Sequence, residues 1–271
     1  MRRRPRALLV MAALLPAACS HLPVPPQPLP VLAGSEVVLL GEVHDNASGH
    51  ARRLAVLRQS VEAGWRPAIA LEQFDRERQA ALTQAQQDCG SDTRCLIRAG
   101  GGEGVDWQWR LYQPVLELAQ RYRLPLLAAN LSRADAGRLV REGVQALPAS
   151  DARLRELLAT IPPDLQRGQE EAVATGHCRQ LPETLLPAMA RAQIARDVVM
   201  AETILPYRQR GVVLLAGNGH VRSDIGVPRW LSGSRSIGFL EAPVLPADGR
   251  YDQIVTIPAV SRDDPCAGVI R

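Results

Sequence analysis

Two histidines of this chain follow apolar segments of the same design. "VVLLGEVHDN", residues 37–46, ends its apolar run just before His44, and "GVVLLAGNGHVRSD", residues 211–224, does the same before His220. The glycines of GEVH and GNGH let the backbone turn sharply, so that each imidazole can project into a crevice. Glu72 of "ALEQF" ends a third apolar run. Two imidazoles and a carboxylate can bind a transition metal or deprotonate a water, which predicts a functional cluster; ordinary structural hydrogen bonds are the alternative.

Polar residues beside these histidines could position the cluster or cap helices. Glu42 and Arg222 could form an ion pair that positions it. Asp45 and Asp224 could equally be helix caps, and capping is the interpretation we favour for Asn46.

The other histidines and one helical segment are less informative. His21 lies in a proline-rich stretch and His50 on a predicted helix, and both are expected to be solvated. The role of His177, in a loop beside Cys178, is left open. Four residues recur at helical spacing and either face the same crevice or pack as an ordinary helix: Gln193, Arg196, Asp197 and Met200.

The segments that must position these side chains alternate between strand and helix. Apolar runs predict strands at 37–42, 68–74, 124–130, 212–218, 236–242 and 251–258. Helical patterns fall at 47–64, 75–87, 112–122, 133–142, 150–160 and 183–206. They predict a single α/β domain over 35–271: a central, mostly parallel mixed sheet flanked by helices, with a helical cap inserted at about 75–185. Parallel strands point their carboxyl ends to one edge, where ligands bind, and right-handed crossovers make neighbours of such strands. We therefore expect 37–42, 68–74 and 212–218 to be adjacent or nearly so.

The charge of the chain gives no sign of a nucleic-acid partner. The 271 residues carry a formal net charge of +4, and Arg2, Arg3, Arg4 and Arg6 supply four positive charges in an opening segment without acids. The remainder is formally neutral, so the basic footprint of a nucleic-acid-binding protein is missing.

The opening segment has the features of a targeting sequence. Arginines, a short apolar run and small residues predict a secretory signal peptide over 1–18. The letters "AAC" that end at Cys19 resemble a bacterial lipobox, with Pro16 as the departure, and predict a lipidated Cys19; a plain signal peptide cut nearby is the alternative. Ser20, in place of an aspartate, favours the outer membrane. Residues 19–34 are proline-rich and predict an extended tether.

Four further cysteines suit the oxidising compartment of an exported protein. Cys89, Cys95, Cys178 and Cys266 allow three pairings. The stretch "CGSDTRC" closes a small loop easily, which favours Cys89–Cys95 and leaves Cys178–Cys266. Metal ligation by these cysteines is less favoured, because none of them forms a CxxC pair.

Several motifs together resemble one family. They are "LLGEVHDN", "ALEQF", "DWQWRLYQPVLELA", "LPLLAANLSR", "GHCRQLP", "AQIARDVVMAETI" and "VVLLAGNGHVRSDIGVPRWL". In this order they resemble the ChaN-type haem-binding lipoproteins, part of a wider group with Tiki, TraB and the erythromycin esterases. The resemblance covers about residues 36 to 262 and implies a mixed α/β sheet with a helical cap, attachment to the outer membrane and a role in haem or iron acquisition.

The resemblance also implies roles for individual residues. His44 of the GExH motif, Glu72 and His220 of the GNxH motif correspond to catalytic or metal-site positions of the superfamily, which makes a divalent metal a second candidate cofactor. Tyr112 could ligate haem iron as a tyrosinate, or pack against Trp107 or Trp109 as part of a hydrophobic cluster. Six residues are expected to contact haem: Glu42, His44, Glu72, Tyr112, His220 and Arg222.

Two functions therefore compete. The first is a haem-binding lipoprotein on the periplasmic side of the outer membrane. The second is a hydrolase, with or without a metal, that uses His44, Glu72 and His220 on an ester or amide. Aromatic residues make up only 4% of the chain. We therefore expect a shallow haem site, or haem held between the two chains of a homodimer, and not a deep enclosed pocket.

Overall fold

The computed structural model describes residues 29–32, 34–102, 107–244, 249–264, 266 and 267. The predicted signal peptide over 1–18, the lipidation site Cys19 and most of the predicted tether over 19–34 lie outside these residues. In the described part of the chain, no helix combines the length and the apolar character needed to cross a membrane.

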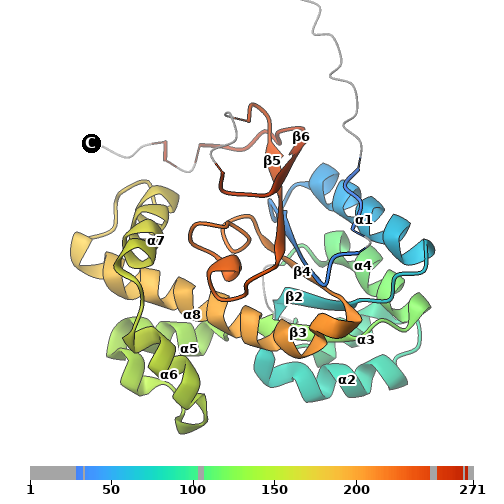
Figure 1. Ribbon diagram of the computed structural model, residues 1–271, viewed down its shortest axis with the longest axis horizontal. Coiled ribbons are helices and arrows are strands. Elements are labelled where there is room, and N and C mark those ends of the chain that lie inside the picture. The colour runs from blue at the N-terminus through green and yellow to red at the C-terminus, as the bar shows by residue number, and fades with distance from the viewer. Residues whose placement is uncertain (1–28, 33, 103–106, 245–248, 265, 268–271) are drawn as a thin grey trace, which may run out of the picture.

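In the described part of the chain, six parallel strands form one sheet at the centre of the molecule (Figure 1). Their bounds are β1 Val37–Glu42, β2 Ala68–Asp75, β3 Leu126–Asn130, β4 Val212–Gly217, β5 Arg235–Glu241 and β6 Gln253–Ile257. The order in the sheet is β3-β2-β4-β1-β5-β6. The three strands that were predicted to carry the cluster are therefore neighbours, which confirms that expectation. The predicted α/β fold is confirmed as well, and every strand pair between the described residues is parallel.

Among the described residues, eight α-helices connect and cover these strands. They are α1 Ala47–Glu62, α2 Gln79–Asp88, α3 Thr93–Ala99, α4 Trp109–Tyr122, α5 Arg133–Glu142, α6 Ala152–Ala159, α7 Pro163–Gly176 and α8 Leu186–Ile204. Short 3-10 turns lie at Arg76–Arg78, Val144–Ala146, Ala149–Asp151, Glu183–Leu185, Leu205–Arg210 and Val227–Arg229. Helices α3 and α7 were not predicted from the sequence.

The alternation of side chains along the strands decides which helix each residue meets. In β1, Val38 and Leu40 pack on the side of α1 and α4, whereas Val37 and Leu39 pack on the side of α8. Glu42 has the same parity as Val38 and Leu40 and therefore points to the side of α1 and α4. In β2, Ala68 and Ala70 pack on the side of α8. Glu72 has the same parity along the strand and therefore also points to the side of α8. The two strand-end carboxylates therefore lie on opposite faces of the sheet.

The middle of the chain, predicted as a helical cap over 75–185, divides into two groups of helices. Helices α2, α3 and α4 join α1 on one face of the sheet. Helices α5, α6 and α7 pack instead around α8, which covers the other face and shares a second core with them (Figure 1). Of the described residues in this segment, those of α7 and His177 directly after it line the pocket described below.

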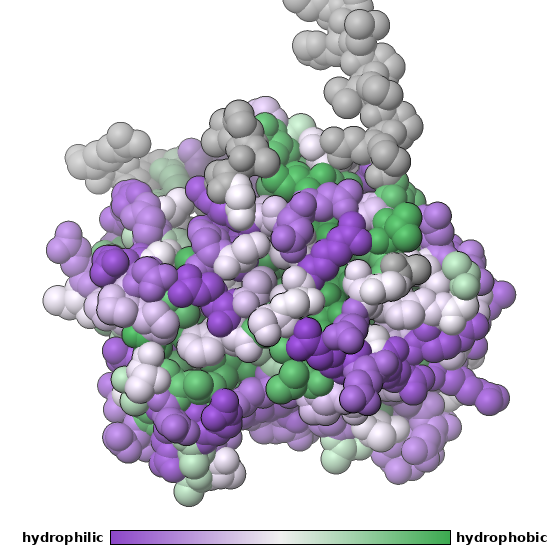
Figure 2. Space-filling model, in the orientation of Figure 1, coloured by the Kyte–Doolittle hydropathy of each residue, from purple (hydrophilic) through white to green (hydrophobic). Residues whose placement is uncertain are grey.

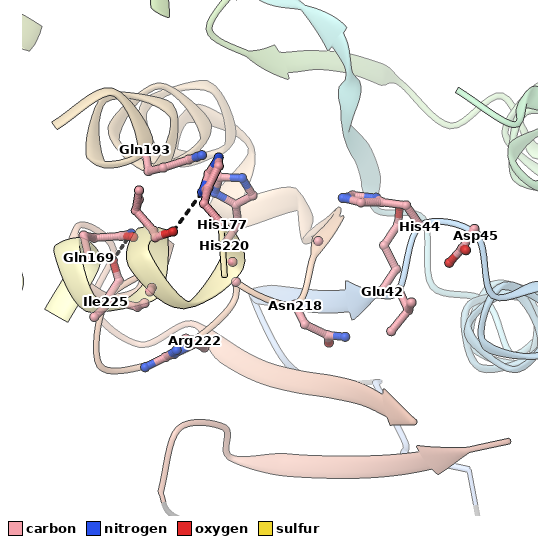
Figure 3. Close-up of a pocket in the computed structure, with 16 residues that line it drawn as sticks. Glu42, His44, Asp45, Gln169, His177, Gln193, Asn218, His220, Arg222 and Ile225 are labelled. Atoms are coloured by element: carbon pink, nitrogen blue, oxygen red, sulfur yellow. Dashed lines mark hydrogen bonds and ion pairs between the residues drawn. The ribbon is translucent and has the colours of Figure 1, made fainter. Parts of the chain in front are cut away.

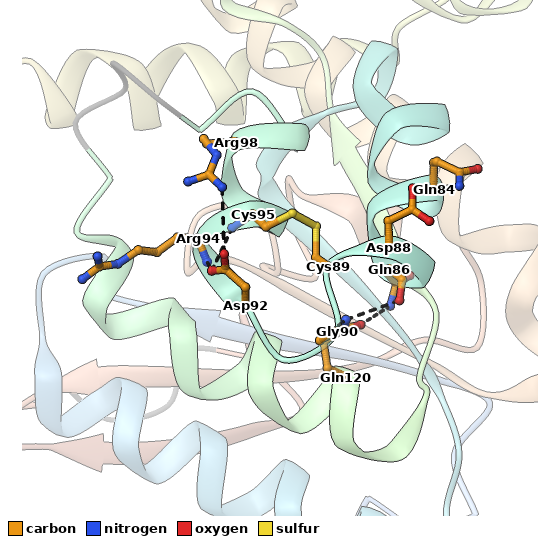
Figure 4. The surroundings of a disulfide bond; sticks show 10 residues. All are labelled: Gln84, Gln86, Asp88, Cys89, Gly90, Asp92, Arg94, Cys95, Arg98 and Gln120. Carbon is orange, nitrogen blue, oxygen red and sulfur yellow. Dashed lines mark hydrogen bonds and ion pairs between the residues drawn. A yellow bond between two sulfur atoms is a disulfide. The ribbon is translucent and has the colours of Figure 1, made fainter.

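Two disulfides join segments of the fold, with the pairing that was predicted. Cys89–Cys95 links the end of α2 to α3, where Asp92 caps α3 through the amides of Arg94 and Cys95 (Figure 4). Cys178–Cys266 links the loop after α7 to the C-terminal tail across 88 residues. Figure 2 shows hydrophilic side chains over much of the viewed face, with hydrophobic ones gathered in smaller patches.

Candidate ligand-binding pocket

The ends of β1, β2 and β4 bring His44, Glu72 and His220 together around Gly217. The amide of Gly217 donates to Glu72 Oε2 at 2.7 Å, and His220 Nε2 lies 3.5 Å from Glu72 Oε1. A Cβ at position 217 would lie only 2.9 Å from His44 Nε2. The glycine of the GNGH turn therefore lets the His44 ring lie directly against the backbone of β4.

His44 is held through one ring nitrogen and presents the other. Its Nδ1 lies 2.7 Å from Glu42 Oε1, and its side chain is 45% exposed. The edge-to-face contact with Trp107, at 5.0 Å between ring centroids, further fixes the plane of the ring. Because Glu42 accepts at Nδ1, Nε2 is the ring nitrogen that remains for a ligand, the arrangement typical of a histidine that ligates a metal or acts as a base.

Glu42 is the centre of a buried network behind His44. Tyr112 donates its hydroxyl to Glu42 Oε1 at 2.5 Å, and Gln73 donates to the same oxygen at 3.3 Å. The guanidinium of Arg53, which is 1% exposed, pairs with Glu42 Oε2. All of these groups donate, so Glu42 acts as a carboxylate acceptor.

The predicted ion pair between Glu42 and Arg222 is wrong. Glu42 faces α1, from which Arg53 reaches it, and Arg222 forms a two-point contact with Asp224, at 2.9 and 2.5 Å. The expected solvation of His50 is wrong too. This histidine is buried, with Nε2 3.0 Å from the His44 carbonyl and Nδ1 3.1 Å from Arg53.

Tyr112 is fully buried and does not line the pocket. It packs edge-to-face against Trp107 and Trp109, each at 5.9 Å between ring centroids. Burial raises the pKa of its hydroxyl above the ordinary value of 10. This environment favours a neutral phenol that donates to Glu42 over the tyrosinate that iron ligation would use.

His220 sits between two carboxylates on the other face of the sheet. Its Nδ1 lies 2.6 Å from Asp197 Oδ1, and its Nε2 faces Glu72. Gln169 of α7 donates to the second oxygen of Asp197 at 3.1 Å and also to the Ile225 carbonyl at 3.0 Å. Burial alone would lower the pKa of His220, but the charges of Glu72 and Asp197 outweigh it and raise the pKa. His220 is therefore an imidazolium, and it holds the pKa of Glu72 well below its ordinary value even though burial opposes this.

The predicted metal site of His44, Glu72 and His220 is not found. Within the described ranges, no group of three or more histidine, cysteine, aspartate or glutamate side chains is arranged to hold a metal ion. The physical reason is that both ring nitrogens of His220 point at carboxylates, so that the ring offers no lone pair to a cation.

We expect the His220 cluster to make stability depend on pH. Because the folded-state pKa of His220 lies above its ordinary 6.5, its stabilisation is fully present below pH 6.5 and is lost as the pH rises through the folded-state pKa. Each unit of pKa shift corresponds to roughly 1.4 kcal/mol. Urea unfolding between pH 6 and 10 should give a falling free energy of unfolding, with a shallower fall in Asp197→Asn. Equal slopes in the two proteins would contradict an imidazolium at position 220.

A pocket of about 570 Å³ opens at this edge of the sheet. Figure 3 shows His44 on one side of it and His220, His177 and Gln193 on the other. Its lining is contributed by the turn after β1, the turn after β4, α7 and α8. Four apolar residues form part of the wall: Val43, Ala172, Val173 and Ile225. Arg222 also lines the pocket, as was expected of a residue at this edge.

Of the four residues at helical spacing on α8, two lie at the site and two do not. Asp197 contacts His220, and Gln193 lines the pocket. Arg196 instead binds Asn130 and the Leu131 carbonyl at the end of β3, and Met200 lies in the core.

Sequence reasoning missed two buried partners, Arg53 and Gln169. The sequence does indicate a special role for Arg53, because this arginine interrupts the apolar face that Val56 and Leu57 form on α1. A charged residue on such a face needs a buried partner.

The fold and the pocket define an α/β protein with a carboxylate-held histidine at the carboxyl edge of a parallel sheet. A family model described as "Haem-binding uptake, Tiki superfamily, ChaN" matches residues 29–231. The match spans well over half of the chain, and the protein belongs to this family.

Comparison with solved structures supports the fold. A structure of ChaN from Campylobacter jejuni, described as "Cofacial heme binding to ChaN of Campylobacter jejuni", aligns with a TM-score of 0.66 and 20% identity, over 81% of this chain and 86% of that one. The type III effector HopBA1 aligns at 0.48 and 14% identity, over 82% and 88% of the two chains. A mutant erythromycin esterase EreC in its open conformation aligns at 0.44 and 17%, over 77% and 71%. No curated protein matches the chain.

Proposed function

We propose that the protein binds haem in this pocket, with His44 Nε2 as an iron ligand. The observation that carries the proposal is the half-exposed His44 side chain on the pocket wall, with Nδ1 fixed by Glu42. Family membership supports it, because the family is described as haem-binding. The ChaN structure from Campylobacter jejuni, which shares the fold, is described as one of cofacial haem binding to that protein.

The residues of the pocket fit the chemistry of haem. Pockets for small molecules and cofactors commonly measure about 300–1,000 Å³ and combine apolar walls with a few polar groups. Val43, Val173 and Ile225 supply apolar wall for a flat macrocycle. When bound, haem supplies an iron centre with open axial positions.

The chain itself keeps His44 ready to bind. Glu42 accepts at Nδ1, and the guanidinium of Arg53 pairs with the same buried carboxylate. Tyr112 occupies a further lone pair of Glu42. Because a neutral imidazole ligand is required, this network sets both the tautomer and the direction of Nε2.

Titration of the purified mature protein with hemin tests the proposal. We expect a shifted Soret band that saturates at a defined stoichiometry. Light scattering during the same titration reports whether two chains share the ligand, the homodimer arrangement that the open pocket permits. A titration indistinguishable from a blank without protein would remove the proposal.

We further propose that the mature protein is lipid-anchored at Cys19 on the periplasmic side of the outer membrane and serves haem or iron uptake. The lipobox-like letters before Cys19 and the proline-rich stretch support this location. Two disulfides are consistent with an oxidising compartment. Loss of membrane fractionation in Cys19→Ser is the expected result, and an unchanged distribution would count against the anchor.

A hydrolase remains the second candidate, because the pairing of His44 with Glu42 is also the arrangement of a general base. An ester and amide screen of the wild-type protein and His44→Ala distinguishes the two functions. Turnover that depends on His44 without hemin would favour the enzyme.

A further inference from the structure

His50 is a buried histidine beside the candidate site that does not line the pocket. It lies in the first turn of α1 and is 5% exposed. Its Nδ1 lies 3.1 Å from the Arg53 guanidinium, and its Nε2 lies 3.0 Å from the His44 carbonyl. The ring also packs edge-to-face on Tyr112, at 4.7 Å between ring centroids. Both ring nitrogens of His50 therefore have a polar partner at hydrogen-bonding distance.

The partners of His50 leave one assignment of its donor and its acceptor. A guanidinium carries only N–H groups, so Nδ1 of His50 accepts from Arg53. The carbonyl of His44 can only accept, so Nε2 of His50 donates to it. This assignment is a neutral imidazole, because a proton on Nδ1 would face the N–H groups of the guanidinium. Burial lowers the pKa of His50 below its ordinary 6.5, the direction that favours the neutral form.

Four residues thereby form a closed cycle of polar contacts that begins and ends at His44, which we name the His50 cycle. The His44 side chain contacts Glu42 through Nδ1, and Glu42 pairs with Arg53 through its other oxygen. Arg53 donates to His50, and His50 donates to the carbonyl of His44. The cycle leaves His44 from its side chain and returns to its main chain. It therefore holds the imidazole relative to the backbone that carries it.

The turn between β1 and α1 fixes where His50 lies. Asn46 caps α1 by accepting from the Gly49 amide at 2.8 Å, and its own amide donates to the Val43 carbonyl at 3.0 Å. These bonds set the start of the helix relative to the end of β1. The His44 carbonyl is joined to α1 by the side chain of His50. His50 therefore transmits the position of the helix to the residue that carries the candidate ligand atom.

We propose that His50 is a positioning residue for His44: it closes the His50 cycle and so fixes the direction in which the His44 imidazole enters the pocket. The two hydrogen bonds of His50, and not its packing on Tyr112, carry this role. The inference rests on the proposed function, in which His44 is the iron ligand. It holds equally if His44 is instead the general base of a hydrolase.

Two substitutions separate the hydrogen bonds of His50 from its packing. His50→Gln keeps a donor and an acceptor on one planar group but loses the aromatic ring. His50→Phe keeps an aromatic ring against Tyr112 but loses both hydrogen bonds. In hemin titrations we expect His50→Gln to bind within about twofold of the wild type and His50→Phe to bind about three- to tenfold more weakly, the range expected for a lost hydrogen bond. The opposite order, or equal affinities in all three proteins, would overturn the inference.

The ring nitrogen chemical shifts of His44 in the haem-free protein test the positioning without hemin. These shifts respond to the hydrogen bonding of each ring nitrogen, and the spectrum of His44→Ala identifies the signals. We expect them to stay close to the wild type in His50→Gln and to be displaced in His50→Phe. If His50→Phe does not fold, His50→Ala takes its place with the same expected results. Wild-type shifts in the variant that lacks both hydrogen bonds would overturn the inference.

Val61→Ala is the matched control for a general loss of stability. Val61 is buried on the same helix but belongs neither to the pocket nor to the His50 cycle. Its variant should lose stability in urea unfolding and still keep the wild-type His44 shifts and hemin affinity. Displaced shifts and weakened binding in this control would attribute the effect to α1 as a whole and overturn the role of His50. A wild-type protein that binds no hemin, with the shifts displaced as predicted in His50→Phe, would remove the haem function and leave the positioning role.

Discussion

Replacement of Arg53 with methionine should lower the free energy of unfolding by about 3–5 kcal/mol, the cost of leaving one member of a buried ion pair without its partner. Arg53 and Glu42 are each 1% exposed in their side chains. Burial lowers the pKa of Arg53 to about 10, so the guanidinium is still charged at neutral pH. Without it, Glu42 would keep only the donors of His44, Gln73 and Tyr112. Urea unfolding at pH 7 measures the loss.

A matched control separates this effect from the loss of any arginine on α1. Arg58 lies on the exposed side of the same helix, and Arg58→Met should change the free energy of unfolding by less than about 0.5 kcal/mol. Arg53→Met combined with Glu42→Gln should recover part of the loss, since the double variant no longer buries an unpaired charge. A loss in Arg53→Met no larger than that of Arg58→Met would contradict the buried pair.

Replacement of His44 with alanine should weaken hemin binding at least about 100-fold, which corresponds to roughly 2.8 kcal/mol at 1.4 kcal/mol per tenfold. The change removes the iron ligand, but Glu42 keeps Arg53 and Tyr112 as partners. Because the His44 side chain is 45% exposed, the free energy of unfolding should change by less than about 1 kcal/mol. Titration and urea unfolding of the same preparation give both values.

Free imidazole provides a chemical control for this variant. It can enter the space that the side chain leaves and should restore the wild-type absorption spectrum of His44→Ala in a concentration-dependent way. A large loss of stability in His44→Ala would identify a structural histidine. Unchanged hemin affinity would exclude this residue as the ligand.

The sheet and the meeting of its strand ends could be predicted from the sequence, because both follow from short apolar runs. Every predicted strand forms within two residues of its expected ends. Parallel strands direct their carboxyl ends to one edge, so His44, Glu72 and His220 could be placed together without knowledge of any side-chain contact. The GNGH turn also explains the close approach of His44 to Gly217.

The partners of these residues could not be predicted in the same way. The alternation along β1 and β2 separates Glu42 from Glu72, but it does not say which helix covers which face. Arg53 and Asp197 are supplied by helices on opposite sides of the sheet. The prediction of a Glu42–Arg222 ion pair is wrong because residues at the same edge of a sheet make contact only if their side chains also point to the same face of the sheet.

Helix α7 shows why part of the helical region between β3 and β4 was not predicted from the sequence. Its buried residues include Gln169, which the helix places against Asp197 and the Ile225 carbonyl. A polar residue in that position weakens the apolar periodicity by which helices are recognised. The reason for the irregular pattern is therefore a hydrogen bond made at the site itself. Helix α3 escaped for a simpler reason: its seven residues span only about two turns.

The position of iron in crystals of the hemin complex tests the central claim most directly. The anomalous scattering of iron marks the metal independently of how the macrocycle is placed. If the account is correct, the iron peak lies within bonding distance of His44 Nε2, with Glu42 still on Nδ1. An iron peak on another residue, with His44 Nε2 unbonded, would contradict it.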